Sequence, residues 1–283
     1  MKQIVVISGK GGTGKTSVVA ALASLAKKKI LVDCDVDAAD LYLIFEPKVR
    51  EEFDFSASKV AIIDKEKCIE CNQCRQACRF KAIAQDFVVD PVACEGCGLC
   101  FHLCPAEAID LKLKSSGCYF VSDTRAGRLV HARLGIAEEN SGRLVSLVRK
   151  KAQELAKKEN SDYILLDGSP GIGCPVIASL TGVDLALIVT EPTLSGVHDL
   201  ERVVGLTNHF QTKTAVCINK YDINLEKTLE IKEYCAKQKI EVVGQLPYSS
   251  LFNKAQMKRQ TLLEYAEKSE VAQEIEKIWQ KIS

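Results

Sequence analysis

Residues 4–17 have the sequence IVVISGKGGTGKTS, an apolar run followed by a glycine-rich turn and the start of an alanine-rich stretch. The apolar run predicts a β-strand, and the stretch from about Thr16 to Lys28 predicts a helix. The turn fits the pattern G-x-x-x-x-G-K-[ST], whose glycines let backbone N–H groups face phosphates at the positive end of the following helix dipole. We therefore expect a nucleotide phosphate site formed by Gly11, Gly12, Thr13, Gly14, Lys15, Thr16 and Ser17.

Two side chains of this turn have distinct expected roles. Lys15 would reach the β and γ phosphates, and the Thr16 hydroxyl would bind magnesium. A glycine-rich turn of purely structural origin is the alternative. The strand before the turn, the helix after it and the Lys-Thr pair together favour the phosphate site.

The alternation of strands and helices continues along most of the chain. A second strand is predicted at Ile30–Val32, and a helix is predicted from about residue 140 to Lys158. Further strands are predicted near residues 163–166, 185–189, 214–218 and 241–246, with helical patterns between them. This order predicts an α/β fold with a doubly wound, mostly parallel sheet.

Residues 60–113 interrupt the alternation and repeat themselves. Asp64 recurs 26 residues later as Asp90, and the cysteines recur at the same offset: Cys68, Cys71, Cys74 and Cys78 as Cys94, Cys97, Cys100 and Cys104. Two similar half-modules predict one small inserted α+β domain. We expect it to lie within a single host domain made of residues 1–59 and 114–283, a size typical of one α/β domain.

Each half of the repeat has the spacing C-x2-C-x2-C-x3-C, which is typical of bacterial ferredoxins. The module resembles a two-cluster ferredoxin, in which the fourth cysteine of each half serves the other half's cluster. That resemblance implies one [4Fe–4S] cluster bound by Cys68, Cys71, Cys74 and Cys104 and a second bound by Cys94, Cys97, Cys100 and Cys78. Two tetrahedral zinc sites are the alternative, but zinc ligands are usually paired in two separated C-x2-C units.

Lys10, just inside the first glycine of the turn, gives the chain its resemblance to the MinD, ParA and nitrogenase iron protein group of P-loop ATPases. The resemblance implies a nucleotide-sandwich homodimer in which Lys10 reaches the partner's phosphates. VDCD, residues 32–35, is similar to the first switch of that group, which implies that Asp35 positions or activates the attacking water near magnesium. Lys10, Lys15 and Asp35 are then the expected catalytic residues.

Residues 164–171, ILLDGSPG, are similar to the second switch of the same group. The resemblance implies that Asp167 holds magnesium through water and that the Gly171 N–H senses the γ phosphate. TEPT, residues 190–193, ends a later strand in the manner of the group but suggests no chemical role.

The identity of the base depends on NKYD, residues 219–222. This pattern reads guanine in many GTPases, whereas the same asparagine contacts adenine in the group that Lys10 suggests. We favour ATP with Asn219 near the base, because the loop with Lys10 is the more specific match. Asp222 keeps GTP open as the alternative.

The composition bounds the partners and the compartment. The chain has 283 residues with 47% hydrophobic residues, and its formal net charge is +1, which gives no support to nucleic-acid or membrane-surface binding. No apolar run approaches the roughly 18 residues of a membrane span, and no signal-peptide pattern is present. Thirteen cysteines without a secretory signal favour reduced thiols in the cytoplasm. Outside the repeat, five cysteines are expected to be buried free thiols: Cys34, Cys118, Cys174, Cys217 and Cys235. For Cys174, a gating thiol is the other expectation.

These predictions combine into two functional hypotheses. The first is a homodimeric ATPase whose ATP and magnesium state is coupled to two [4Fe–4S] clusters, for ATP-gated electron delivery to a redox or iron–sulfur protein partner or for iron–sulfur assembly. The second is a regulatory or positioning ATPase of the MinD and ParA type, whose clusters sense redox state or stabilise the insertion.

Overall fold

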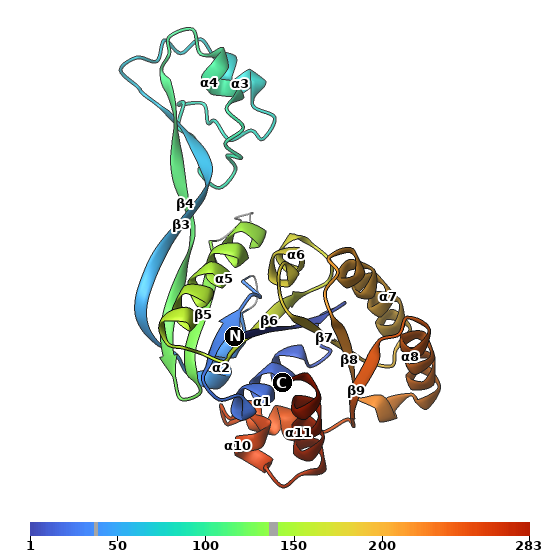
Figure 1. Cartoon of the computed structure of the whole chain (residues 1–283). Coiled ribbons are helices and arrows are strands. Elements are labelled where there is room, and N and C mark those ends of the chain that lie inside the picture. Colours follow the sequence, from blue (N-terminus) through green and yellow to red (C-terminus); the bar gives the residue numbers. More distant parts are fainter. Residues whose placement is uncertain (37–38, 136–140) are drawn as a thin grey trace. The chain divides into compact units, whose positions relative to one another are not determined.

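The computed structural model describes residues 1–36, 39–135 and 141–283, which form two compact units. The first unit contains residues 1–52, 119–133 and 141–283, and the second contains residues 53–118 and 134–140. Figure 1 shows the elements of both units along the chain. The predicted insertion, residues 60–113, lies inside the second unit.

A mostly parallel sheet is the centre of the first unit. The whole sheet has nine strands in the order β3-β4-β5-β2-β6-β1-β7-β8-β9, and each pair of neighbours from β5 to β9 is parallel. The strands from β5 onward in this order are β5 (Gly127–Leu134), β2 (Lys29–Asp33), β6 (Tyr163–Pro170), β1 (Lys2–Ser8), β7 (Leu185–Thr190), β8 (Thr214–Asn219) and β9 (Glu241–Leu246). The α/β class with a mostly parallel sheet is thereby confirmed.

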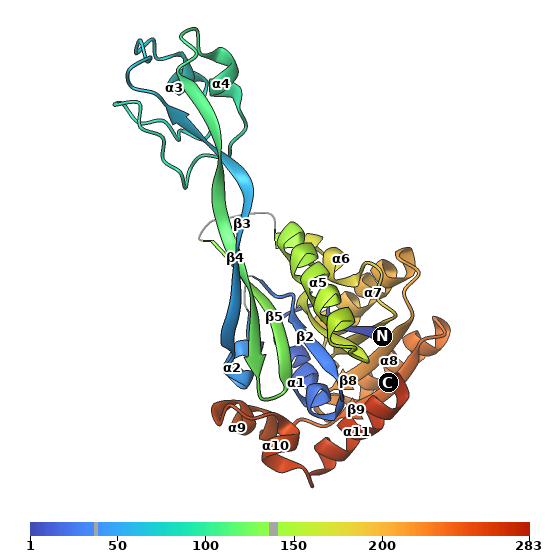
Figure 2. The same ribbon diagram turned by 60° about the vertical axis from the view of Figure 1, so that its left-hand side comes forward.

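Helices cover both faces of this sheet (Figure 1 and Figure 2). One face carries α1 (Lys15–Leu25), α10 (Leu262–Ala266) and α11 (Glu270–Ile282), and the other carries α5 (Ser141–Lys158), α6 (Cys174–Leu180), α7 (Leu194–His209) and α8 (Leu225–Lys237). Two short helices, α2 (Leu41–Phe45) and α9 (Leu251–Met257), and a 3-10 turn at Tyr221–Ile223 complete the unit. Among the described residues, no helix is long and apolar enough to cross a membrane.

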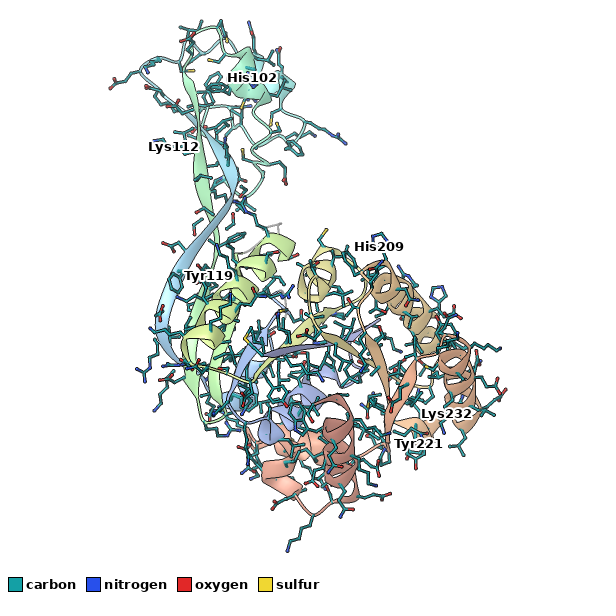
Figure 3. All side chains as sticks on the ribbon, in the orientation of Figure 1. His102, Lys112, Tyr119, His209, Tyr221 and Lys232 are labelled. Carbon is teal, nitrogen blue, oxygen red and sulfur yellow. The ribbon has the colours of Figure 1, made fainter. Side chains whose placement is uncertain are left out.

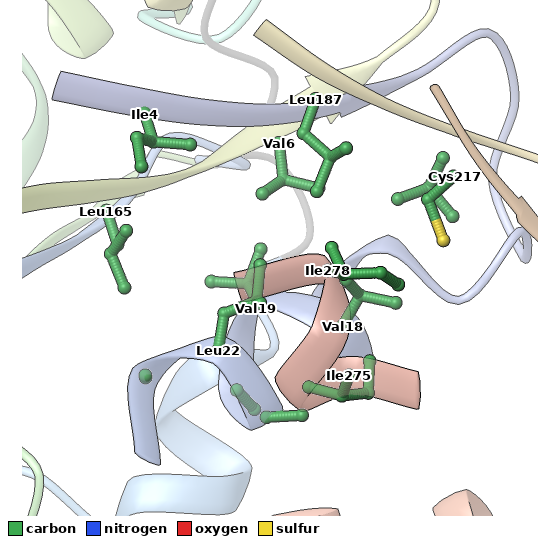
Figure 4. Close-up of a cluster of buried hydrophobic side chains, with 14 of the residues drawn as sticks. Ile4, Val6, Val18, Val19, Leu22, Leu165, Leu187, Cys217, Ile275 and Ile278 are labelled. Carbon is green, nitrogen blue, oxygen red and sulfur yellow. The ribbon is translucent and has the colours of Figure 1, made fainter. Parts of the chain in front are cut away.

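The core between the sheet and α1 fixes where the phosphate-binding turn lies. Val18, Leu22 and Ile275 are fully buried against Ile4 and other sheet residues (Figure 4). Burying a side chain of this size contributes about 1.5–3 kcal/mol. The start of α1 is therefore held at the carboxyl end of β1.

Close packing at the C-terminus depends on one glycine. A Cβ on Gly244 of β9 would lie 2.3 Å from Cγ1 of Ile278, so only glycine lets α11 approach this strand. The apolar face of α11 is buried against the sheet.

The second unit is built on two long strands and two short helices. β3 (Lys48–Ile63) and β4 (Ile109–Thr124) each begin or end in the first unit, and α3 (Gln73–Ala77) and α4 (Leu99–Leu103) lie between them. Neither β3, β4 nor β5 is among the strands predicted from the sequence. A small core joins the two halves of the unit around Ile83, Phe87 and Ile109.

The backbone of the second unit repeats with the period of its sequence. Positive φ angles occur at Glu70, Asn72 and Lys81, and again 26 residues later at Gly96, Gly98 and Glu107. Each half also pairs with the other, since the Asp64 N–H donates to Ala108 O at 2.8 Å and the Asp90 N–H donates to Ala82 O at 2.7 Å. The repeat is therefore structural as well as sequential.

Candidate functional site

The glycine-rich turn has the backbone that its sequence predicts. Gly12 and Gly14 have φ angles of +79° and +90°, which residues with a Cβ rarely adopt. A Cβ on Gly14 would also lie 2.4 Å from Nδ2 of Asn219. Gly14 is the N-cap of α1, so no side chain caps the first turn of that helix. Its N–H groups therefore face the end of the sheet as a site suited to an anion.

Lys15 lies at the centre of a buried charge cluster. Its Nζ is 2.5 Å from Oδ1 of Asp167, 3.9 Å from Oδ2 of Asp35 and 3.4 Å from the Thr16 hydroxyl. Burial by itself would lower the pKa of the Lys15 ammonium, but the Asp167 carboxylate, with Asp35 and Asp33, outweighs burial and raises that pKa. The structure thus brings together four of the residues predicted for phosphate and magnesium binding.

Asp33 belongs to this cluster, although the sequence analysis did not select it. Its two carboxylate oxygens accept N–H bonds from Asp35 at 3.1 Å and Leu41 at 3.2 Å, so it shapes the segment that carries Asp35. Complete burial and then the nearby Asp167 carboxylate raise the pKa of Asp33 well above its ordinary value. The first aspartate of VDCD was the available signal, but sequence alone does not distinguish a capping carboxylate from a catalytic one.

Two buried oxygens of the site lack partners. Thr13 Oγ1 and Asp167 Oδ2 have no hydrogen-bond partner among the described residues. Buried polar groups are usually satisfied, and unsatisfied ones mark positions where an ion, water or ligand binds. One oxygen belongs to the turn and the other lies beside Lys15. This donor set fits a magnesium-bound triphosphate.

Lys10 binds side chains of its own chain. Its Nζ lies 2.7 Å from Glu191 Oε1, 2.8 Å from Ser195 Oγ and 3.1 Å from Thr193 Oγ1. Thr193 is also the N-cap of α7, where its hydroxyl accepts from the Gly196 N–H. TEPT, for which the sequence suggested no role, therefore lies beside the turn.

Lys220 joins the same group of residues. Its Nζ lies 2.8 Å from Glu191 Oε2 and donates to Gly12 O at 3.0 Å. Burial opposes ionisation of Glu191, but the hydrogen bonds and charges of Lys10 and Lys220 outweigh burial, so the pKa of the Glu191 carboxyl lies below its ordinary value. Glu191 and Lys220 were not predicted as site residues.

The second switch has a different arrangement from the one its predicted role requires. The Gly171 N–H, expected to sense a phosphate, donates to Ser8 O at 2.8 Å. Its φ of +93° is one that glycine readily adopts. In this conformation the Gly171 N–H is committed to β1, so contact with a phosphate requires this hydrogen bond to break.

The residues predicted near the base bind protein groups. Asn219 Nδ2 donates to Thr13 O at 2.7 Å, which ties the end of β8 to the glycine-rich turn. Asp222 Oδ1 accepts the Tyr248 N–H at 2.6 Å and so holds the segment after β9. Asn219 therefore lies beside the phosphate-binding turn, and Asp222 has a structural partner.

The eight cysteines of the repeat line two cavities of the second unit. One cavity is lined by Cys78, Cys94, Cys97 and Cys100, and the other is lined by Cys68, Cys71, Cys74 and Cys104. Each cavity thus takes three cysteines from one half of the repeat and the fourth from the other half. Among the described residues, no group of three or more His, Cys, Asp or Glu side chains is arranged to hold a metal ion.

No disulfide joins any of the thirteen cysteines. Cys34, Cys217 and Cys235 are buried as expected, and burial raises the pKa of Cys217 to about 12 and that of Cys235 to about 11. Cys118 is half-buried. Cys174, the first residue of α6, is exposed, so the burial expected for it is wrong, and the gating role stays a prediction.

The histidines lie on separate elements. His102 is in α4, His131 is in β5, and His198 and His209 are in α7; Figure 3 labels the first and the last of these. His131 contacts the Ser122 hydroxyl through Nε2 at 2.9 Å. None of the four contributes to the clusters of residues described above.

The family model of the CobQ/CobB/MinD/ParA nucleotide binding domain matches residues 4–262. An uncharacterized protein of Methanocaldococcus jannaschii is 33% identical over 225 residues, which cover 78% of this chain and 79% of that protein. The pyruvate synthase subunit PorD of Thermotoga maritima is 37% identical over 78 residues, which cover 25% of this chain and 77% of the subunit.

A solved structure has the same fold. It is the septum site-determining protein MinD of Pyrococcus horikoshii, complexed with Mg-ADP, and it matches with a TM-score of 0.63 at 18% identity. The match covers 100% of this chain and 96% of that protein.

Proposed function

The chain belongs to the CobQ/CobB/MinD/ParA nucleotide-binding family, and from this premise we propose that it is an ATP-dependent switch of the MinD and ParA type. In this proposal the first unit binds and hydrolyses ATP with magnesium, and the second unit holds two [4Fe–4S] clusters. Family membership favours this regulatory hypothesis over the first hypothesis of the sequence analysis, in which the clusters deliver electrons.

The cluster around Lys15 is the observation that carries the nucleotide site. Lys15 pairs with Asp167 and contacts the Thr16 hydroxyl. Two buried oxygens, Thr13 Oγ1 and Asp167 Oδ2, have no hydrogen-bond partner among the described residues. When bound, magnesium supplies positive charge to the phosphates. The chain's own part is to hold that ion with Thr16, Asp35 and Asp167 and to reach the phosphates with Lys15 and the backbone of the turn.

Loss of nucleotide binding on replacing Lys15 tests this site. Lys15→Ala removes charge-assisted hydrogen bonds worth about 1.5–3 kcal/mol each, so ATP affinity should fall by on the order of 100-fold. Titration with a fluorescent ATP analogue measures it, with exposed Lys27→Ala as the control. Thr16→Ala, which leaves the Lys15 and Asp167 ion pair in place, should weaken the dependence on magnesium. If both Lys15→Ala and Thr16→Ala bind ATP as the wild type does, the proposed nucleotide site is wrong.

Asp222 supports ATP over GTP. Asp222 Oδ1 already accepts the Tyr248 N–H at 2.6 Å, so a guanine would have to share this oxygen with the backbone or displace the bond. Asn219 lies beside the glycine-rich turn. Competition between ATP and GTP for the fluorescent analogue tests this choice, and tighter binding of GTP would overturn it.

The two cysteine-lined cavities support two cubane clusters. In a cubane each iron binds one thiolate, and each cavity is lined by four cysteines in the combination implied by the ferredoxin resemblance. The protein prepared without oxygen should contain about eight irons and eight labile sulfides per chain. Stoichiometric zinc without sulfide would overturn the assignment.

The partner in the proposed cycle is a second copy of the chain, with ATP between the two copies and Lys10 of each reaching the other's phosphates. One observation favours the alternative of ATP-gated electron transfer or cluster assembly with a redox or iron–sulfur partner. β3 and β4 each contribute residues to both units, so the chain is continuous between the proposed nucleotide site and the proposed clusters through two strands.

A further inference from the structure

The Lys10 ammonium has no donor left over in this conformation. A lysine ammonium has three N–H donors and no acceptor. Glu191, Thr193 and Ser195 of the same chain supply three oxygens at 2.7, 3.1 and 2.8 Å, one for each donor. A phosphate can therefore bind Lys10 only when at least one of these bonds breaks.

Glu191 is the charged member of this set. Its side chain is 11% exposed and that of Lys10 is 28% exposed, so the pair is shielded in part from solvent. Each Glu191 oxygen faces a different lysine, because Oε1 binds Lys10 and Oε2 binds Lys220. Lys220 in turn donates to the Gly12 carbonyl, within the phosphate-binding turn. Glu191 thus connects the end of β7 to both lysines and, through Lys220, to the turn.

We propose that Glu191 is a positioning residue that holds Lys10 within its own subunit until ATP binds, so that two subunits pair only when Lys10 leaves Glu191, Thr193 and Ser195. The inference rests on the proposed function, because it assigns a regulator to the ATP-dependent dimer. Glu191 then sets the ATP concentration at which pairing begins. The two hydroxyls complete the coordination of the ammonium but carry no opposing charge.

The first test measures Lys10 without any nucleotide. Glu191→Gln keeps the shape of the side chain but removes the charge, so the Lys10 amine should react faster with an acylating reagent. Because the ion pair is partly exposed, its loss should have a moderate effect, and we expect the rate to rise about three- to tenfold. Peptide mass spectrometry reads the label at Lys10 itself.

Two variants control this measurement. Glu274→Gln removes a half-buried glutamate paired with Lys277 at 2.6 Å and should leave Lys10 labelling unchanged. Lys220→Gln removes the competing ammonium but leaves Glu191 charged, so Lys10 labelling should not accelerate. Equal labelling in Glu191→Gln and the wild type would overturn the proposal. Equal acceleration by Lys220→Gln would also overturn it, because the effect would then come from the turn.

The second test measures pairing. Light scattering during an ATP titration should show that Glu191→Gln forms dimers at about three- to tenfold lower ATP than the wild type, with Glu191→Asp in between. A higher ATP requirement in Glu191→Gln would overturn the proposal, because Glu191 would then stabilise the paired state. A wild type that binds ATP but stays monomeric would overturn the proposed dimer and this inference with it. An unshifted requirement in a protein that does dimerise would overturn this inference alone.

Discussion

At the scale of single residues, the main feature of the site is a group of buried charged side chains. Lys15, Asp33 and Asp167 are all buried, and Lys15 is the ammonium that compensates the two carboxylates. Removing one partner of a buried pair usually destabilises a protein more than the pair itself contributes. Binding variants at Lys15 therefore need a check of folding, such as thermal unfolding followed by circular dichroism.

Asp35 permits a cleaner substitution. It lies at the edge of the charge cluster, with Oδ2 3.9 Å from Lys15 Nζ and the side chain 15% exposed. Asp35→Ala should leave ATP affinity within about threefold, because Lys15 and the turn still hold the phosphates. Its turnover should fall by about 100-fold or more, the range expected when a group that moves or orients a proton is lost.

Steady-state phosphate release and ATP titration together check this prediction about Asp35. Asp40→Ala is the matched control, because it removes an exposed carboxylate from the same segment of the chain. If Asp35→Ala and the wild type hydrolyse ATP at the same rate, Asp35 does not act on the attacking water.

At the scale of elements, the sequence predicts best where burial is complete. The strands β1, β6, β7 and β8 each contain a continuous apolar run, since both faces of a parallel sheet are covered. β7 and β8 were predicted to within one residue of their observed bounds and β1 to within two, whereas β6 continues four residues beyond its predicted end at Leu166, through the polar residues of DGSP. β3 was missed because most of its 16 residues are exposed or half-buried and its first half, KVREEFDF, is rich in charge.

The contacts within the site also divide into those that the sequence predicts and those that it does not. The meeting of Lys15 with Asp167 was predictable, because parallel strands place their carboxyl ends along one edge of the sheet. The contacts of Lys10 with Glu191 and Ser195 were not, because they depend on the rotamer of a long, flexible side chain. The available signal was TEPT at the end of a buried strand.

The β4 and β5 strands carry a pH-sensitive pair. His131 contacts the Ser122 hydroxyl at 2.9 Å and stacks on Phe120 with ring centroids 5.1 Å apart. Burial lowers the pKa of His131 to about 4. Between this value and an unfolded pKa of about 6.5, the unfolded chain binds more protons than the folded one, so stability falls as the pH is lowered.

We expect this pair to cost the wild type about 1–2 kcal/mol of unfolding free energy between pH 7 and pH 5. His131→Gln cannot gain a proton and should lack that part of the loss. Urea unfolding at the two pH values measures the difference. The same loss in both proteins would mean that His131 does not titrate in this way.

At the scale of the whole molecule, the central question is whether the nucleotide and the two proposed clusters influence each other. The chain passes between the two units within β3 and within β4, and each strand is 16 residues long. A strand that is hydrogen-bonded in both units can transmit a change in one to the other only if that change favours one of two arrangements. Covalent continuity permits coupling but does not require it.

By thermodynamic linkage, the coupling between ATP and the clusters is a single factor that two different titrations can measure. Suppose that ATP binds more tightly to the protein with reduced clusters than to the protein with oxidised clusters. Each tenfold in this ratio of affinities then requires ATP to shift the one-electron midpoint potential by about 59 mV. We expect a coupling of about 5- to 150-fold if ATP gates electron transfer, the range typical of allosteric proteins.

Redox titration with and without ATP measures the potential, and ATP titration of oxidised and reduced protein measures the affinity ratio. Lys15→Ala should remove both effects together, because ATP that does not bind cannot change the properties of the clusters. Equal affinities and an unshifted potential in the wild type would contradict gating. The clusters would then serve the ATP-dependent switch as structural centres of the second unit, because a redox sensor also has to change the affinity for ATP when its oxidation state changes.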